Sequence, residues 1–223
     1  MATNTLTQNI NQAISDFNGV RQAIIEKGVE IPSGTPTSQY SAKISEIQSG
    51  GGGGVEPTIG YQITEWDEEG YPVKIKIYGM TEIPAGFFYN NSSSSGGFIK
   101  LSDISGWNNV SVIGNYAFNN CSNLALTSLP EGLTTIGNYA FNNCKNIALT
   151  SLPEGLTTIG DYAFAYFYGL TTLTIGSAIQ TISSTAFKGC PNLTSITINR
   201  AEGTVSGAPW GATKATIKWV GNS

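Results

Sequence analysis

A 23-residue unit repeats along the C-terminal part of the chain, and this repeat constrains the fold more than any other feature. Residues 113–135 read IGNYAFNNCSNLALTSLPEGLTT, and residues 136–158 repeat them with two substitutions. More divergent copies begin at Ile159 and Ile182. Tandem units of this length bury their apolar faces by stacking on one another, so we expect a solenoid.

Aligning the copies produces columns of one residue type, which define the expected core. The first columns are Ile113, Ile136, Ile159 and Ile182; Ala117, Ala140, Ala163 and Ala186; and Phe118, Phe141, Phe164 and Phe187. Two further apolar columns are Leu124, Ile147, Leu170 and Leu193; and Leu129, Leu152, Ile175 and Ile198. Rungs stacked about 4.8 Å apart would join these columns into continuous buried stripes. The expected fold class is a mainly β solenoid of short strands and short helical or 3-10 turns.

The three cysteines fall into one such column, where Phe167 takes the place of the fourth: Cys121, Cys144 and Cys190. Their odd number argues against a disulfide framework. A metal site or a reactive thiol needs histidine partners or an electropositive setting, and the chain has no histidine. We therefore expect buried cysteines that pack as small hydrophobic side chains, and neither a metal nor a cofactor.

A divergent first rung and two caps complete the expected solenoid. Ile83 and Phe88 fit the Ile and Phe columns if seven extra residues are inserted in a Ser- and Gly-rich stretch. The solenoid is then expected over residues 83–206. Because a terminal rung leaves an open sheet edge, we expect a capping β-hairpin over residues 58–82 and a C-terminal cap with a closing strand over residues 207–223.

The N-terminal segment is expected to be a separate helical unit. Its apolar residues are spaced close to a heptad pattern: Ile10, Ile14, Phe17 and Ile24. We interpret residues 1–48 as an attachment or oligomerisation segment that pairs with another protein or with copies of itself, for instance as a homotrimeric coiled coil. The alternative is that this segment packs on the repeat. Residues 49–57 form a Gly-rich linker that would uncouple the two parts.

Candidate binding residues lie in columns beside the buried ones. Tyr116, Tyr139 and Tyr162 form a column next to a polar column of Asn and Asp. Such a ladder offers flat apolar faces with hydrogen-bonding groups beside them, which suits sugar or protein contacts. The alternative is that the rings only cover the edges of the rungs.

The third complete rung differs from its neighbours at one place. It reads Ala-Tyr-Phe where the two preceding rungs have Asn-Asn-Cys, and a further tyrosine follows, so that Tyr166 and Tyr168 are expected to project outward beside Asn142 and Asn143. An aromatic patch on a polar surface is typical of a binding site, and we expect specificity to lie there.

Several functions are not expected. General acid–base catalysis usually needs histidine or a carboxylate pair in a cleft, and Glu131 and Glu154 are only equivalent turn residues, so we do not expect an enzyme. The net charge is −4 and the basic residues form no run, which argues against a nucleic-acid partner. No apolar stretch suits a signal peptide or a bilayer span, so membrane insertion is not expected.

The columns resemble the BspA-type leucine-rich repeats, whose pattern runs I-G-x-x-A-F-x-x-C-x-x-L followed by a strand and a Pro-containing turn. The resemblance covers about residues 78–206. Two rungs depart from it, because Thr127 and Thr150 stand where the family usually has an apolar residue, with Leu126 and Leu149 one place earlier. The register of these two rungs is therefore left open.

The two ends of the chain carry a second resemblance. Residues 16–19 and 22–32 look like the start of tail-fibre and baseplate proteins of tailed phages, and residues 207–212 look like a segment found after repeats in phage structural proteins. This resemblance implies a virion protein of the tail or baseplate, assembled in the host cytoplasm. It would bind other tail proteins through its N-terminus and a host-surface glycan or protein through its repeats. The alternatives are a BspA-like adhesin on the bacterial cell surface and a purely structural virion spacer.

Overall fold

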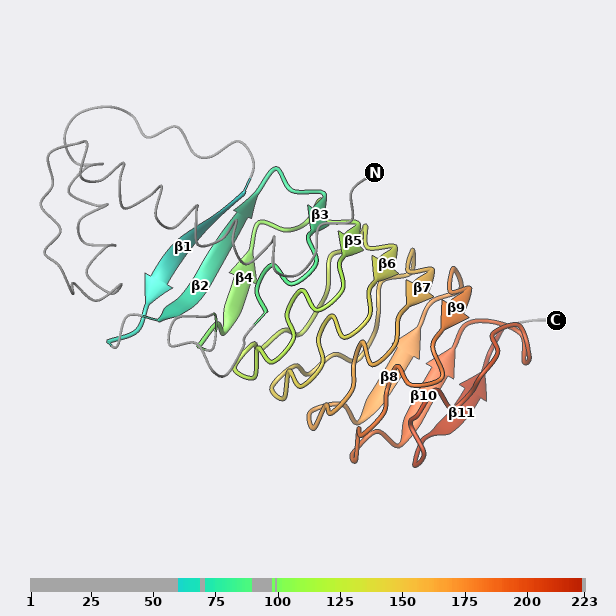
Figure 1. Ribbon diagram of the computed structural model, residues 1–223. Helices are drawn as coiled ribbons and strands as arrows, with labels where there is room; N and C mark the ends of the chain where they lie inside the picture. The colour runs from blue at the N-terminus through green and yellow to red at the C-terminus, as the bar shows by residue number, and fades with distance from the viewer. Residues whose placement is uncertain (1–59, 69–70, 90–97, 99, 222–223) are drawn as a thin grey trace, which may run out of the picture.

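The computed structural model describes residues 60–68, 71–89, 98 and 100–221. These residues form one elongated stack of rungs with a hairpin at one end and a short strand at the other (Figure 1). The N-terminal segment, with Ile10, Ile14, Phe17 and Ile24, lies outside the described residues, as does the Gly-rich linker. The helix, the coiled coil and the trimer therefore stay predictions.

One side of the stack is a parallel sheet to which each rung adds a strand of two residues. Its strands, in the order β3-β5-β6-β7-β9, are β3 (Glu82–Ile83), β5 (Val112–Ile113), β6 (Thr135–Ile136), β7 (Thr158–Ile159) and β9 (Thr181–Ile182). In every strand the isoleucine is buried and its neighbour faces outward. Ile83 pairs with Ile113, 30 residues on, which confirms the seven extra residues of the first rung.

The chain leaves each of these strands through hydrogen-bonded turns. In the first complete rung Ala117 N–H donates to Gly114 O at 3.3 Å and Cys121 N–H donates to Phe118 O at 3.0 Å. The short helical or 3-10 turns expected here do not form in the described residues. The reason is the backbone of Tyr116 and Asn120, whose φ angles of 59° and 64° are left-handed and interrupt a right-handed helix.

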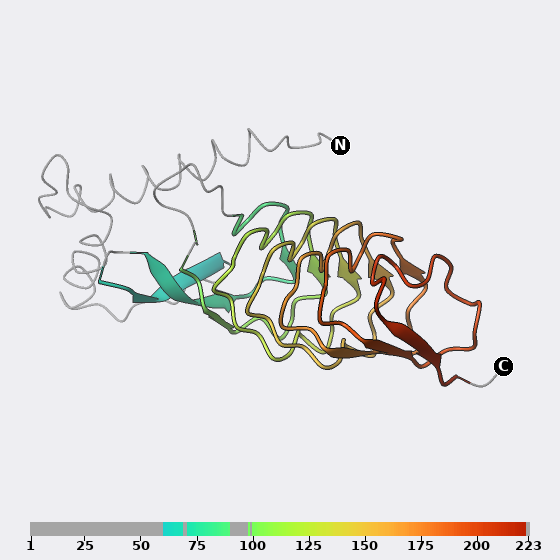
Figure 2. The same cartoon turned by 90° about the horizontal axis from the view of Figure 1, so that it is seen from below.

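The opposite side of the stack carries longer strands, but only near its two ends. β8 (Thr172–Ile175), β10 (Ser195–Ile198) and β11 (Thr216–Trp219) form a parallel sheet in the order β11-β10-β8. At the other end, β4 (Asp103–Ser105) pairs with the capping hairpin. The two rungs between β4 and β8 form no strand on this side, only an isolated bridge between Ser151 and Thr174, and Figure 2 shows plain coil there.

The register of those two rungs explains the missing strands. Leu126 and Leu149 are buried, whereas Thr127 and Thr150 are exposed, so the leucine one place early takes the inward position. The next inward residue after Leu126 is three positions later, at Leu129, whereas residues on one face of a strand are two apart. In these two rungs, buried and exposed side chains therefore cannot alternate along the chain as they do in β8 and β10, and no strand forms.

Both ends of the stack are closed by apolar side chains. The strands β1 (Gly60–Trp66) and β2 (Pro72–Tyr78) pair antiparallel where the hairpin was expected, and β2 buries Ile75 and Ile77 against the first rung. At the other end Trp210 is fully buried in the place of the Ala column, since its carbonyl accepts from Phe187 N–H at 2.9 Å. The Trp219 ring meets Trp210 edge-on at 6.1 Å.

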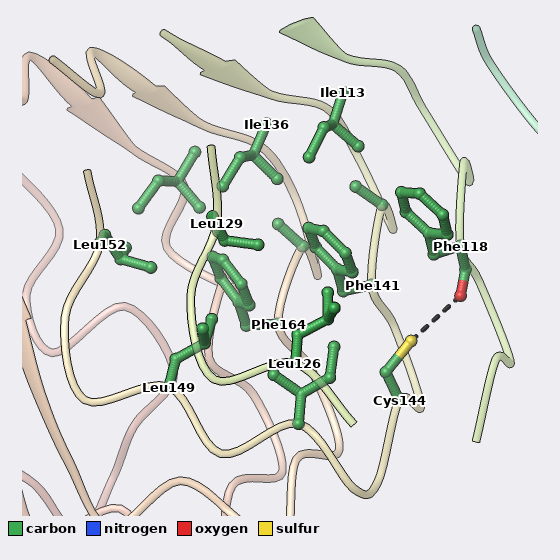
Figure 3. Close-up of a cluster of buried hydrophobic side chains, with 14 of the residues drawn as sticks. Ile113, Phe118, Leu126, Leu129, Ile136, Phe141, Cys144, Leu149, Leu152 and Phe164 are labelled. Carbon is green, nitrogen blue, oxygen red and sulfur yellow. Dashed lines mark hydrogen bonds between the residues drawn. The ribbon is translucent and has the colours of Figure 1, made fainter. Parts of the chain in front are cut away.

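The buried columns predicted from the repeat are confirmed. The phenylalanine rings lie one above another, with centroids 5.1–5.8 Å apart and interplanar angles of at most 15° from Phe88 to Phe187. Figure 3 shows the Phe, Ile and Leu side chains converging between the two sides of the stack. The core is thus one continuous apolar stack rather than a set of separate clusters.

The cysteines are buried and hydrogen-bonded, as expected of packing residues. The Cys144 thiol donates to Phe118 O of the preceding rung at 3.1 Å (Figure 3), and Cys190 makes the equivalent bond to Phe164 O. Burial raises the pKa of Cys144 well above its usual range and that of Cys190 to about 11. No disulfide joins them and, in the described part of the chain, no group of three or more potential metal ligands occurs.

No helix suited to crossing a bilayer is found in the parts of the chain that the structure describes.

Candidate functional site

The tyrosine column lies at a corner of the stack where the backbone is left-handed. Tyr116, Tyr139 and Tyr162 have φ angles of 59°, 56° and 54°. The equivalent residue of the first rung is Gly86, with φ of 67°. A left-handed backbone costs a tyrosine roughly 1–2 kcal/mol compared with glycine, so other contacts must offset this cost in each of the three rungs.

Ring stacking and side-chain hydrogen bonds provide that offset. The rings of Tyr116 and Tyr139 are 4.9 Å apart and inclined by 3°, and those of Tyr139 and Tyr162 are 4.8 Å apart and inclined by 12°. Beside them, Asn115 Oδ1 accepts from Asn138 N–H at 2.7 Å, and Asn138 Oδ1 accepts from the next rung. Desolvation by the packed rings also raises the pKa of the Tyr139 phenol, with the neighbouring Tyr162 and Tyr116 as further causes.

The ends of the tyrosine ladder are covered as well. Tyr89 meets Tyr116 edge-on at 6.5 Å, and Lys188 Nζ lies 5.4 Å from the ring centroid of Tyr162. The ladder of Tyr116, Tyr139 and Tyr162 therefore presents ring edges and hydroxyls to solvent, not the flat faces suggested by the sequence.

Asn142 and Asn143 belong to rung-to-rung amide ladders. Asn142 Nδ2 donates to Asn119 Oδ1 and Asn143 Nδ2 donates to Asn120 Oδ1, both at 3.0 Å. Asn142 Oδ1 is buried and has no hydrogen-bond partner among the described groups, because Ala165 occupies its position in the next rung. These amides are thus mainly engaged with each other, and the ladder ends where the third rung departs from the repeat.

Tyr166 and Tyr168 project outward as expected, on either side of the buried Phe167. Their exposed fractions are 45% and 52%, and neither makes a ring–ring contact in the described structure. Tyr166 follows Asn143 in its column with a φ of 60°, and its ring lies over Gly189, where a Cβ would be 2.6 Å from the ring. Tyr168 therefore keeps the most exposed aromatic ring of this corner.

Three lysines, which the sequence suggested were scattered, lie at this same corner. Lys145 occupies the position of Tyr168 in the preceding rung, and Lys188 opens the equivalent turn of the following rung. Lys214 belongs to the last turn, where it lines a depression together with Tyr168 and Pro191. The 23-residue spacing alone could have brought Lys145 and Lys188 to this corner, but not Lys214, because the last turn departs from that spacing and Ser195 pairs with Thr216, 21 residues on.

A shallow depression marks the middle of the corner. It has a volume of about 240 Å³ and is lined by Tyr168, Pro191 and Lys214, together with Gly189 and Gly211. An exposed aromatic ring, a proline and a lysine can together contact a flat apolar surface that bears negative charge.

The comparison with protein-family models agrees with this architecture. The family model for the BspA type Leucine rich repeat region matches residues 81–206 in 6 copies. No curated protein sequence matches the chain. A leucine-rich repeat protein from Bacteroides ovatus is similar in structure, with 26% identity, a TM-score of 0.43 and coverage of 67% of this chain and 48% of the other. A leucine-rich repeat protein of T. pallidum has 20% identity and a TM-score of 0.48, over 73% of this chain and 91% of the other.

The chain therefore spans about half the length of the Bacteroides protein. More than half of its own residues lie within the matched repeat region, and their columns point inward as the repeat pattern requires. The chain belongs to the BspA-type leucine-rich-repeat family.

Proposed function

We propose that this chain is a non-catalytic recognition protein whose repeats bind a glycan or protein on a host surface. The observation that carries the proposal is the pair of exposed aromatic rings of Tyr166 and Tyr168. Aromatic side chains grouped on an otherwise polar surface are typical of binding hot spots.

The fold does not need these two tyrosines. The two preceding rungs build the same corner with Asn-Asn-Cys, and their columns are just as well buried. Tyr166 also has a left-handed backbone, which costs a tyrosine more than it costs the asparagines at this position in those rungs. The ring of Tyr166 covers Gly189 of the next rung, but about half of each tyrosine stays exposed, and exposed rings that the preceding rungs do without are best explained by a ligand.

Binding without catalysis is supported by the chemistry of the described residues. Their thiols are buried, hydrogen-bonded and protonated at neutral pH, so they are poor nucleophiles. The chain also lacks histidine, the commonest general acid or base.

For the setting, we propose a tail fibre or baseplate of a tailed phage. Support comes from the resemblance of residues 16–32 and 207–212 to phage structural proteins. In this setting residues 1–48 would attach to other tail proteins. The second candidate is a bacterial surface adhesin that binds host matrix proteins, which membership of the BspA-type family favours.

Binding of the labelled full-length chain to candidate host cells tests the recognition role. The variant Tyr166→Asn/Tyr168→Ser uses residues that other rungs already place at these positions, at Asn143 and Ser122, so its fold should persist. Loss of two hot-spot side chains is expected to weaken binding by about tenfold or more.

The control is Val220→Thr, which removes an exposed apolar side chain elsewhere and should leave binding unchanged. If the tyrosine variant keeps its melting temperature and binds as well as the wild type, the Tyr166 and Tyr168 patch is not the site. If the wild type binds no host cell, the structural spacer is the better explanation. Immunogold labelling of purified particles separates the virion from the bacterial surface.

A further inference from the structure

The corner around Tyr168 carries a local charge opposite to that of the whole protein. It is built from the equivalent segments 119–124, 142–147, 165–170 and 188–193, together with residues 211–216 of the last turn. These segments contain three lysines, Lys145, Lys188 and Lys214, and no Asp or Glu, whereas the chain has a net charge of −4. We call Lys145, Tyr166, Tyr168, Lys188 and Lys214 the lysine corner.

The positive charge of the lysine corner is not neutralised from within the described structure. The ion pairs found there join Lys74 to Glu65 at 2.7 Å and Lys100 to Asp67 at 3.7 Å, both at the hairpin end. Lys145, Lys188 and Lys214 have no carboxylate within ion-pair distance among the described residues. Their ammonium groups are therefore available to an anionic ligand.

One carboxylate lies in a neighbouring column, and its hydrogen bonds hold it within the protein. Asp161 accepts from the hydroxyls of Ser183 and Thr185 in the next rung. It keeps its negative charge, but among the described residues it makes no ion pair with Lys188.

The rung spacing arranges the corner as a row. Lys145, Tyr168 and Pro191 occupy one column of three successive rungs, about 4.8 Å apart, and Lys214 of the last turn lines the depression with Tyr168 and Pro191, so the two lysines lie on opposite sides of Tyr168. The exposed ring of Tyr168 lies between them beside the depression of about 240 Å³. Cations on both sides of an exposed aromatic ring match a chain of sugar rings, each with an apolar C–H face, that carries acidic groups at intervals.

We propose that the lysine corner binds an acidic oligosaccharide, whose pyranose ring stacks on Tyr168 and whose carboxylate or sulfate groups contact Lys145, Lys188 and Lys214. This proposal rests on the recognition role proposed above and names its ligand class. The Lys188 ammonium also lies over Tyr162, so the tyrosine ladder holds this cation at the edge of the corner.

Isothermal titration calorimetry of the full-length chain with defined hexasaccharides tests the proposal. Oligogalacturonate supplies carboxylates, a sulfated maltohexaose supplies sulfates, and unmodified maltohexaose is the neutral counterpart. We expect at least one acidic probe to bind at least tenfold more tightly than the neutral one. Its affinity should fall as NaCl rises from about 50 to about 200 mM, because the lysine contacts are exposed to solvent.

Variants locate the site. Lys145→Ser introduces the residue found at the equivalent position of the preceding rung, Ser122, and should weaken binding of the acidic probe about two- to fivefold. The triple variant Lys145→Ser/Lys188→Asn/Lys214→Ser should weaken it about tenfold to a hundredfold. Lys218→Ser removes the same charge from an exposed position on β11 and should change affinity less than twofold. All variants alter exposed side chains, so their melting temperatures should match that of the wild type.

The proposal is overturned if neither acidic probe binds, if acidic and neutral probes bind equally, or if Lys218→Ser weakens binding as much as Lys145→Ser. Binding of a DNA duplex with the same loss in the lysine variants but no binding of either saccharide would also overturn it. If cells still bind in a Tyr168-dependent manner while no acidic saccharide binds, only the ligand class is wrong. If Tyr166→Asn/Tyr168→Ser leaves both cell and saccharide binding intact, the recognition role of this patch fails too.

Discussion

The phenylalanine stack makes a quantitative prediction, because the same side chain is buried with different numbers of ring neighbours. Phe141 and Phe187 are both fully buried. Phe141 stacks on Phe118 at 5.2 Å and on Phe164 at 5.8 Å, whereas Phe187 stacks only on Phe164, at 5.6 Å, among the described rings. Substitution by alanine should therefore cost more free energy of unfolding at the central rung.

The expected magnitudes follow from burial and stacking. Truncation of a buried phenylalanine to alanine costs about 3–5 kcal/mol, and one stacked aromatic pair contributes about 0.5–1.5 kcal/mol beyond burial. Phe141→Ala removes two such pairs and Phe187→Ala removes one. We expect Phe141→Ala to be the more destabilising by about 1 kcal/mol. Phe141→Leu, which keeps most of the apolar volume, should cost clearly less than Phe141→Ala.

Equilibrium urea unfolding measures these differences. Tryptophan fluorescence reports on both ends of the stack, since Trp107 meets Phe118 edge-on at 6.1 Å and Trp210 closes the last rung. If the fluorescence and circular dichroism transitions coincide and the m-value is unchanged, each variant unfolds in one cooperative transition and its free energy of unfolding can be compared with that of the wild type. The reasoning is refuted if Phe187→Ala costs as much as Phe141→Ala under those conditions.

Three further predictions concern other columns. Ala165→Asn should raise the free energy of unfolding by about 1 kcal/mol, measured by urea unfolding, because its amide can donate to the unpartnered Asn142 Oδ1. Gly137→Ala should lower the melting temperature, because the new Cβ would lie 2.7 Å from a backbone nitrogen of the preceding rung. The matched control is Gly132→Ala, whose Cβ would have no atom nearer than 4.0 Å and which should be neutral or slightly stabilising. The free energy of unfolding should fall as pH rises from about 9 to about 11. In the folded protein, burial raises the pKa of the Cys190 thiol to about 11, whereas in the unfolded chain this thiol loses its proton near the ordinary pKa of cysteine. Cys190→Ala should reduce this pH dependence by roughly 2–3 kcal/mol over that range, and an unchanged slope would contradict the assignment.

The core was predictable because the repeat places the same side chain at the same position in each rung. The Phe column from Phe118 to Phe187 and the buried cysteines needed only the 23-residue spacing. The register of Leu126 and Leu149 was not settled by that spacing, since either the leucine or the following threonine could have faced inward. In the structure the leucines face inward, because burying the larger apolar side chain is more favourable, and these two rungs form no strand on that side.

The surface was less predictable than the core. The sequence placed Tyr116, Tyr139 and Tyr162 in one column, but their left-handed backbone and mutual stacking depend on the path of the turn. Outward projection of Tyr166 and Tyr168 followed from the alternation with Phe167. The grouping of Lys214 with them depended on the path of the divergent last turn, where the repeat pattern is weakest.

The near identity of residues 113–135 and 136–158 has a consequence for the length of the molecule. Each of these units presents almost the same upper and lower surface, so an additional copy inserted between them would find every neighbour it requires. The two capped ends would then move apart by about 4.8 Å without being rebuilt. Gain or loss of whole units can therefore adjust the reach of this protein, while the corner that carries Tyr168 keeps its own composition.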